Sequence, residues 1–282
     1  MAKVYEALRR AEEERKRRVG GLPGGPLAAL DFELPAGATA GERPPWWKRL
    51  LPRGAQAAPE TTADLNKRRI TLLQPDSFVA EQYRTLRGRI DAIAAQRPIK
   101  TLAVTSALPG EGKTTAAINL ATVTALSLGR RVLLVDCDLR RPQVHRSLGL
   151  NPEAGLAEVL TDRVGLDQAV TKVEGANLEV LGVRWRPENP SELLSSDRMR
   201  ELIEEVARRY DRVILDTPAA LGLPDAKAVS DLCDGLVLVV RANQTSHYDV
   251  ATTLEVLDRR RLLGLVLNGA DAHRGRYGYY PS

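Results

Sequence analysis

Between residues 100 and 270, hydrophobic side chains gather in short runs that polar residues hardly interrupt. Every residue is apolar from Val132 to Val135 and from Leu236 to Val240. Such runs are typical of strands covered on both faces of a parallel sheet, whereas a half-exposed strand alternates. The runs that predict strands span residues 101–106, 131–136, 178–183, 212–217, 235–241 and 263–268.

The stretches between these runs are expected to form helices. Strands that alternate with helices imply right-handed crossovers and an α/β fold with a doubly wound, mostly parallel sheet. Ligands of such sheets bind beyond the C-terminal ends of the strands. The expected helices in this region span residues 113–128, 192–210, 225–232 and 248–260.

The first 65 residues lack this alternation and are expected to form an extended N-terminal segment. Residues 1–19 are strong helix formers with a thin apolar stripe, which indicates a solvated helix or one that docks on a partner or an acidic membrane surface. Residues 20–65 are rich in Gly, Pro and Ala and predict a flexible linker. An ordered domain is expected over residues 66–270, followed by a tail of residues 271–282.

A further helix is predicted over residues 78–90, with its apolar residues on one side. Glu81, Arg84 and Arg87 recur every three residues and therefore share a neighbouring stripe. This stripe is either a solvated face with a weak internal salt bridge or a contact with another subunit.

A glycine-rich turn joins the first predicted strand to the next helix, in the sequence Ala-Leu-Pro-Gly-Glu-Gly-Lys-Thr-Thr from Ala107 onward. Backbone N–H groups of such a loop, together with the helix N-terminus, form a cradle for phosphate oxygens. Lys113 would bridge the β- and γ-phosphates, and the Thr114 hydroxyl would hold Mg²⁺. The pattern departs from G-x-x-x-x-G-K-[ST] only at Ala107, which takes the place of the first glycine. The alternative interpretation is an ordinary strand-turn-helix with a surface lysine. The loop residues expected to bind nucleotide are Pro109, Gly110, Glu111, Gly112, Lys113, Thr114 and Thr115.

Acidic residues follow two of the predicted strands. Asp136 and Asp138 are two positions apart in an extended segment, so both carboxylates can face one site. Arg140 lies just beyond them and suits a phosphate, while carboxylates suit a metal ion or a proton. Asp216 ends another apolar strand, as the Mg²⁺-side aspartate of a phosphate-loop enzyme does. The alternative for the first pair is that the two aspartates cap a helix.

Three of the seven tyrosines fall in the last six residues, at Tyr277, Tyr279 and Tyr280. Chance clustering in a basic terminus is the alternative reading. The tail leaves the last predicted strand near Asn268, and twelve extended residues reach at most about 40 Å, which suffices for a neighbouring subunit.

Composition narrows the classes of function. The net charge of +5 is mild, the basic residues are scattered and only 4 % of residues are aromatic, which argues against a nucleic-acid binder. No apolar run reaches the roughly 18 residues that span a bilayer. Cys137 and Cys233 are expected to be reduced thiols of a cytoplasmic protein.

Together, residues 107–115, the segment Asp-Cys-Asp-Leu-Arg-Arg-Pro at 136–142 and Ile-Leu-Asp-Thr-Pro at 214–218 resemble the bacterial tyrosine kinases, the autokinases of capsule and exopolysaccharide systems. Segments 145–150 and 189–195 are also similar to that family. The resemblance covers about residues 66–282 and implies a P-loop NTPase fold.

The resemblance also implies roles for individual residues. Lys113 and its loop would bind ATP, and Thr114, Asp138 and Asp216 would hold Mg²⁺. Asp136 would accept or steer the tyrosine proton, although Asp136 and Asp138 could exchange roles. The catalytic residues expected on this basis are Lys113, Asp136 and Asp138.

The same resemblance implies partners. Glu81-x-x-Arg84-x-x-Arg87 is similar to the oligomerisation motif of the family, whose members form rings that present the tail of one subunit to the next. A separate membrane-spanning activator of the chain-length-regulator class and a tyrosine phosphatase are expected. The protein would then be cytoplasmic and recruited to the inner face of the plasma membrane.

The sequence thus predicts an ATP-dependent tyrosine autokinase that phosphorylates its tail in trans and regulates polysaccharide synthesis or export. One alternative is a partition or positioning ATPase, but these carry a lysine early in the loop, where this chain has Leu108 and Pro109. A second is an iron–sulfur reductase component, for which Cys137 and Cys233 are the only thiols. A third is a nucleotide-binding adaptor without catalysis.

Overall fold

The computed structural model describes residues 66, 68–127 and 129–270. The helix expected over residues 1–19, the linker expected over 20–65 and the tyrosine tail lie outside the described residues.

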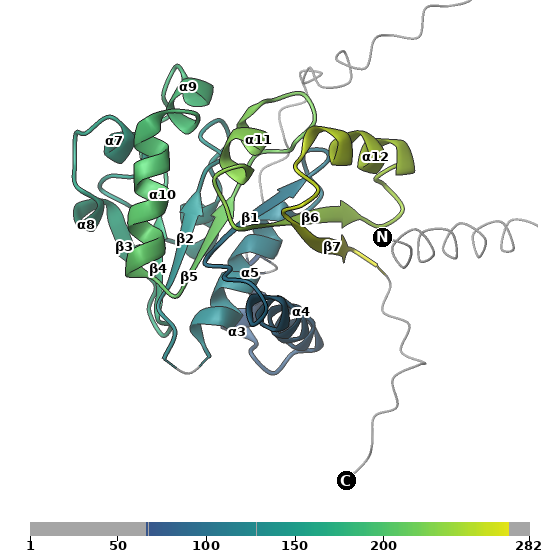
Figure 1. Cartoon of the computed structure of the whole chain (residues 1–282). Helices are drawn as coiled ribbons and strands as arrows, with labels where there is room; N and C mark the ends of the chain where they lie inside the picture. The colour runs from purple at the N-terminus through teal and green to yellow at the C-terminus, as the bar shows by residue number, and fades with distance from the viewer. Residues whose placement is uncertain (1–65, 67, 128, 271–282) are drawn as a thin grey trace, which may run out of the picture. The chain divides into compact units, whose positions relative to one another are not determined.

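A seven-stranded sheet forms the centre of the described domain (Figure 1). All neighbouring strands pair in parallel except β3 and β4, which are antiparallel. The mostly parallel, doubly wound sheet predicted from the hydrophobic runs is therefore confirmed. In the order β3-β4-β2-β5-β1-β6-β7, the strands span Val170–Lys172, Leu178–Leu181, Val132–Asp136, Arg212–Asp216, Thr101–Ser106, Gly235–Arg241 and Leu262–Asn268.

Helices cover both faces of this sheet, each over its own hydrophobic core (Figure 1). On one face lie α3 (Ile70–Leu73), α4 (Phe78–Ala94), α5 (Lys113–Ala125) and α6 (Val144–Leu148). On the other lie α7 (Leu156–Leu160), α8 (Leu166–Ala169), α9 (Pro190–Leu194), α10 (Asp197–Arg209), α11 (Asp225–Ser230) and α12 (His247–Val256).

Helix α5 is buried along almost its whole length, because it packs between the sheet and α4. Apart from Lys113 and Asn119, its residues are apolar or small on all sides, as expected of a helix that is largely buried. The loop that precedes α5 is thereby fixed to the centre of the sheet.

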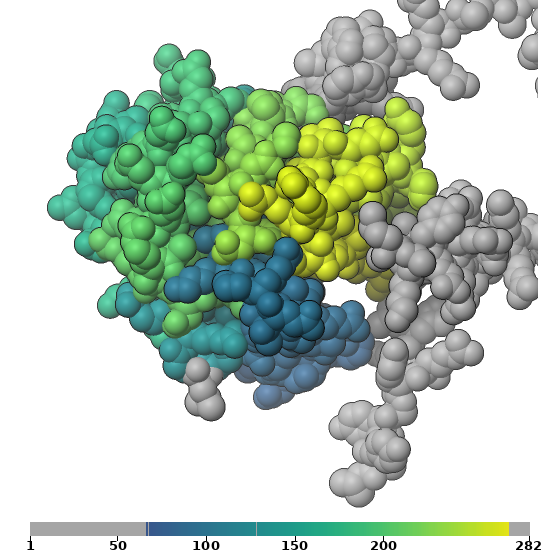
Figure 2. Space-filling view, viewed as in Figure 1, coloured from purple at the N-terminus to yellow at the C-terminus, as the bar shows by residue number. Residues whose placement is uncertain are grey.

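Figure 2 shows the α4 surface in blue beside the C-terminal elements in yellow. At this place the Arg97 guanidinium, which follows α4, donates to the Arg260 carbonyl at 3.3 Å.

The structure departs from the predicted elements in two ways. The single helix expected over 192–210 is two helices, because Ser196 interrupts it and caps α10 by accepting a hydrogen bond from the Met199 N–H at 3.2 Å. The short elements α3, α6, α7, α8 and β3 were not predicted, since each has five residues or fewer. Among the helices of the described ranges, none is long and apolar enough to cross a membrane.

Candidate active site

The predicted glycine-rich loop joins β1 to α5 and turns through two left-handed residues. Gly110 has φ of 85° and Gly112 has φ of 97°, a region that side chains strongly disfavour. A Cβ atom at Gly112 would lie 2.0 Å from Asn268 Nδ2, so the close approach of β7 also requires glycine there. Pro109 is exposed at the loop, while Thr115 is half-buried in the first turn of α5.

The side chain of Glu111 holds the loop together from inside. Its carboxylate accepts a hydrogen bond from the Leu108 N–H at 3.0 Å and another from the Thr245 hydroxyl. Glu111 is only 4 % exposed. Its expected part in nucleotide binding therefore concerns the shape of the loop and its backbone.

Residues at the ends of β6 and β7 hold the same loop from outside. The Asn268 side-chain amide donates to the Glu111 carbonyl at 2.8 Å, and the Arg241 guanidinium donates to the Gly110 carbonyl at 2.8 Å. The carbonyl oxygens of Gly110 and Glu111 therefore point toward the ends of β6 and β7. Sequence reasoning missed Arg241, Thr245 and Asn268. The signal available was that each is a polar residue at or just after the C-terminal end of a predicted strand.

The three predicted aspartates meet Lys113 at the C-terminal edge of the sheet. Asp136 and Asp216 are direct partners in the register of β2 and β5. Lys113 Nζ lies 3.0 Å from Asp138 Oδ2, and both side chains are largely buried. The structure thus brings the lysine and all three carboxylates of the sequence prediction into one cluster.

Asp136 is fully buried, and backbone groups surround its carboxylate. One oxygen accepts from the Asp138 N–H at 3.1 Å, and the other accepts from the N–H groups of Gln143 and Val144 at 3.0 Å each. Burial raises the pKa of Asp136 strongly, and the nearby Asp216 charge adds to this effect. Asp136 therefore fixes the start of α6 against the end of β2.

Asp216 is also fully buried, but neither of its oxygens has a hydrogen-bond partner among the described residues. Burial raises the pKa of Asp216, while the charge of Lys113 opposes that rise. The Thr114 hydroxyl is close enough to lower this pKa, although it makes no hydrogen bond of normal geometry. Burial alone would lower the pKa of Lys113, but the carboxylates of Asp216 and Asp138 outweigh it and raise that pKa.

An orphaned, buried carboxylate is costly unless a cation satisfies it. Oxygen donors from Asp216, Asp138 and Thr114 suit Mg²⁺, which commonly binds one or two carboxylates and completes its shell with phosphate and water oxygens. No three His, Cys, Asp or Glu side chains in the described ranges cluster closely enough to hold a metal by themselves, so phosphate and water oxygens would have to complete the shell. The site therefore fits a magnesium nucleotide.

Arg140, which the sequence places among the nucleotide ligands, is engaged elsewhere. Its Nε donates to Asp225 Oδ2 at 2.8 Å and its Nη2 donates to Ser191 Oγ at 2.8 Å. The Ser191 hydroxyl in turn donates to the buried Asp225 carboxylate. Arg140 thus ties the loop after β2 to α9 and α11, and its contact with a nucleotide stays a prediction.

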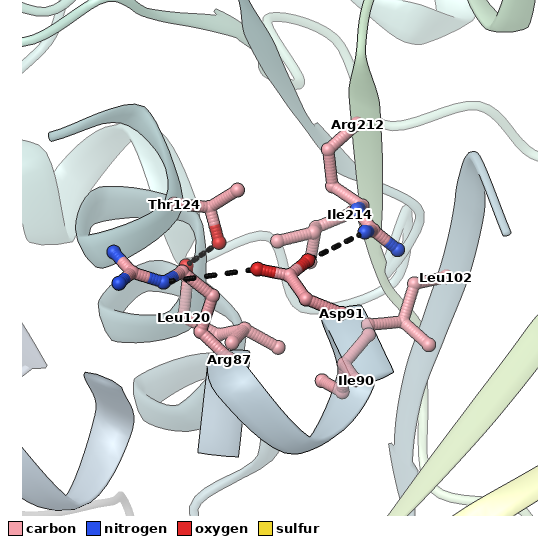
Figure 3. A pocket seen from close by; sticks show the side chains of 8 residues that line it. All are labelled: Arg87, Ile90, Asp91, Leu102, Leu120, Thr124, Arg212 and Ile214. Carbon is pink, nitrogen blue, oxygen red and sulfur yellow. Dashed lines mark hydrogen bonds and ion pairs between the residues drawn. The ribbon is translucent and has the colours of Figure 1, made fainter. Parts of the chain in front are cut away.

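The stripe of Glu81, Arg84 and Arg87 lies on α4, and its members have partners within the chain. Glu81 pairs with Arg84 at the surface. Arg87 donates to the Val123 carbonyl of α5 at 2.7 Å. It also lies 4.0 Å from Asp91, at a small pocket between α4, α5 and the sheet that is remote from the nucleotide loop (Figure 3). The role of the stripe between subunits stays a prediction, and the tail tyrosines lie outside the described residues.

Comparison with known proteins gives consistent results. A family model described as an AAA domain matches residues 99–261. Tyrosine-protein kinase YwqD of Bacillus subtilis (strain 168) is 42 % identical over 214 residues, which cover 75 % of this chain and 90 % of YwqD.

Two further relatives extend the comparison. Succinoglycan biosynthesis transport protein ExoP of Rhizobium meliloti (strain 1021) is 32 % identical over 247 residues, and the match covers 81 % of this chain but only 31 % of ExoP. The solved kinase domain of the Escherichia coli tyrosine kinase ETK superposes with a TM-score of 0.68 at 31 % identity, over 75 % of this chain and 84 % of that domain.

Proposed function

This chain belongs to the bacterial tyrosine-protein kinases, and from that premise we propose that it transfers the γ-phosphoryl group of ATP to Tyr277, Tyr279 and Tyr280 of its own tail in trans. The observation that carries this proposal is the buried cluster of Lys113, Asp138 and Asp216 beside the glycine loop.

In this proposal, N–H groups of the loop and the Lys113 ammonium hold the phosphates of ATP. Thr114 and Asp216 would hold Mg²⁺, which would neutralise charge on the phosphate oxygens, and Asp138 lies at the same place. The contacts of Glu111, Arg241 and Asn268 keep the loop in one shape before the nucleotide arrives. Such preorganisation is the main contribution that a protein makes to phosphoryl transfer.

The transfer forms a bond between the tyrosine oxygen and the γ-phosphorus. The bond from that phosphorus to the β–γ bridging oxygen breaks, and ADP leaves with the electron pair. The phenol pKa exceeds that of an ordinary aspartate by roughly six units, or about 8 kcal/mol, so the hydroxyl proton must leave late, after bond formation has acidified it.

The geometry supports Asp138 as the carboxylate that meets the tyrosine hydroxyl. Asp136 and Asp138 then exchange the roles that the family resemblance implies, an alternative that the sequence left open. Asp136 is 0 % exposed and both of its oxygens already accept backbone N–H groups. Asp138 is 7 % exposed and lies two residues beyond the C-terminal end of β2. Asp136 then acts as a positioning residue for the segment that carries Asp138.

Burial disfavours two of the three described tyrosines as acceptors. Tyr83 is half-buried and desolvation raises its pKa to about 12, while Tyr210 is buried and hydrogen-bonds Glu179. Among the described tyrosines, only Tyr248 is largely exposed, at 76 %.

Transfer in trans is supported by the place where β7 ends. Strand β7 ends at Asn268, which contacts the phosphate loop, and a tail leaving there would need a sharp turn to enter its own site. The exposed pair Glu81 and Arg84 would face the next subunit of a ring. Each tail phosphate adds roughly −1.5 to −2 charges, and three phosphates on each of the adjacent tails would repel acidic partners and loosen that ring.

We further infer a separate membrane-spanning activator, a phosphatase that resets the tail, and recruitment to the inner face of the plasma membrane. The process controlled would be synthesis or export of a polysaccharide, as the name of ExoP states for that relative.

A mixing experiment tests the transfer. Lys113→Met protein with an intact tail is the acceptor, and chain truncated after residue 270 is the enzyme. With Mg-ATP, phosphate should appear on the tail of the acceptor only when the enzyme is present. Lys227→Met, which alters an exposed lysine paired with Asp231, is the matched control and should retain autophosphorylation. An unlabelled acceptor in the mixture would refute transfer in trans.

A further inference from the structure

A basic surface surrounds Trp185 in the loop between β4 and α9. Arg184, Trp185 and Arg186 are all exposed there, at the C-terminal edge of the sheet that also carries the phosphate loop. Within the described part of the chain, neither Arg184 nor Arg186 makes a hydrogen bond or ion pair. Two exposed arginines thus flank the exposed Trp185 in the sequence.

Neighbouring elements add positive charge to this surface. The Arg163 guanidinium, which follows α7, lies 4.7 Å from the centre of the Trp185 ring. His145 of α6 packs against the loop, because a Cβ atom at Gly182 would lie 3.3 Å from His145 Cβ. Its Nδ1 is buried without a partner among the described residues. Burial, and to a lesser extent the charges of Arg186, Arg146 and Arg184, lower the pKa of His145.

This cluster adjoins the acidic half of the active site. The N–H groups of Gln143 and Val144 bind Asp136, so the helix that carries His145 starts on the active-site carboxylate. The acids closest in sequence, Glu153 and Glu188, form no ion pair with the arginines. A ligand with negative charge would therefore find unneutralised arginine next to the place where a tyrosine is phosphorylated.

We propose that the Arg184–Trp185–Arg186 surface binds a phosphotyrosine of the C-terminal tail of a second copy of this chain. This inference rests on the proposed function and names a second site for the same substrate. A tail that already carries one phosphate would be held there while another tyrosine enters the active site.

The chemistry of the tail supports this occupant. Guanidinium groups bind phosphate oxygens in pairs, and an indole ring packs against a phenyl ring. The side chains of the unmodified tail carry a net charge of only +1, from Arg274 and Arg276 against Asp271, and one phosphate of roughly −1.5 to −2 makes the tail acidic. Five strand spacings, about 24 Å, separate β7 from β4, and the proposed transfer in trans brings the tail of a neighbour, rather than the chain's own, to the edge of the sheet where this surface lies.

Fluorescence of Trp185 provides the test. Replacing Trp46 and Trp47 by Phe leaves Trp185 as the one tryptophan of the full chain. Dephosphorylated, nucleotide-free protein is titrated with a synthetic peptide of residues 271–282 that carries phosphotyrosine at position 279, and with the same peptide unphosphorylated. We expect the phosphopeptide to change the fluorescence and to bind at least about tenfold more tightly, in line with charge-assisted hydrogen bonds.

Arg184→Ala combined with Arg186→Ala should lower phosphopeptide affinity about tenfold or more. The matched control, Arg200→Ala with Arg208→Ala on the exposed face of α10, should leave it unchanged. Equal binding of the two peptides, absence of binding, or an affinity that the double variant leaves intact would overturn the proposal. Binding of phosphatidylserine vesicles in place of the peptide would also overturn it and would assign the surface to a membrane.

A kinetic readout separates this site from catalysis. With Mg-ATP, the double variant should label the first tyrosine at the wild-type rate but accumulate singly phosphorylated tails, as seen by mass spectrometry. Because the peptide is phosphorylated chemically, its binding is measured even if the chain were not to phosphorylate its own tail. Wild-type proportions of multiply phosphorylated tail in the double variant would contradict the proposal.

Discussion

The two sides of the active site are built from contacts of very different range. On the loop side, Gly110 and Glu111 are bound by Arg241, Thr245 and Asn268, which lie more than 130 positions away in the sequence. On the acidic side, all the hydrogen bonds of the Asp136 carboxylate come from within eight positions. The loop therefore has its shape only when β6 and β7 are in place, whereas the surroundings of the Asp136 carboxylate are shaped by its own segment.

Lys113 joins the two sides, since it starts α5 and pairs with Asp138. Lys113→Met should therefore have the largest effect and lower the initial rate of tail phosphorylation by about 10²- to 10³-fold, the range seen when one charge-stabilising donor is lost. Quantitative phosphotyrosine detection gives the rate. If Lys113→Met kept more than a third of the wild-type rate, the lysine would not belong to the site.

Asp216→Asn should lower the rate about a hundredfold without loss of stability. The buried carboxylate has no partner among the described residues, so a neutral isostere removes a charge that only a bound cation would satisfy. Thermal unfolding without nucleotide should show a melting temperature equal to or above that of the wild type. A clear fall in melting temperature would mean that Asp216 is paired in the free protein.

The acidic side also predicts how stability depends on pH. The pKa values of Asp136 and Asp216 are raised in the fold, above all by burial, so the folded chain binds protons more readily than the unfolded chain. Without Mg²⁺ and nucleotide, stability should therefore increase as pH falls from mildly alkaline to mildly acidic values. Melting temperatures across that range test this, and Asp216→Asn should flatten the slope. A slope of opposite sign would contradict the raised pKa values of these two buried carboxylates.

On the loop side, Asn268→Ala removes one hydrogen bond, worth about 1 kcal/mol. The expected result is a rise of about fivefold in KM for ATP with a smaller change in kcat, because the cradle loosens while the acids stay in place. Asn177→Ala is the matched control. Its amide donates to the Arg130 carbonyl at 2.9 Å at the opposite edge of the sheet, and KM should not change. A fall in kcat that is larger than the rise in KM would place Asn268 in the transfer step itself.

The smallest effect on stability is expected for the most local contact, the exposed pair of Glu81 and Arg84. Replacing both with Ala should cost no more than about 0.5 kcal/mol, whereas Arg87→Ala should cost about 1 kcal/mol through its bond to Val123. Light scattering should nevertheless show a smaller assembly for the Glu81 and Arg84 variant. An unchanged mass would remove this stripe from any subunit interface.

The same contrast between local and distant contacts explains what the sequence could predict. The strand-loop-helix around Lys113 and the neighbouring placement of Asp136 and Asp216 follow from hydrophobic runs and parallel pairing. The bond from Asn268 to the loop has no local pattern, because it depends on strand order. Strand β3 was missed because three partly exposed residues make no hydrophobic run. The bonds of Arg140 to Ser191 and Asp225 have no local pattern either, because these partners lie far away in sequence.

The central claim is that this site delivers phosphate to the tail. Mass spectrometry of the full chain after incubation with Mg-ATP measures it directly, with Lys113→Met as the blank. The account predicts phosphate on Tyr277, Tyr279 and Tyr280 in the wild type and none in the variant alone. A tail without phosphate, or phosphate confined to another tyrosine such as the exposed Tyr248, would contradict it.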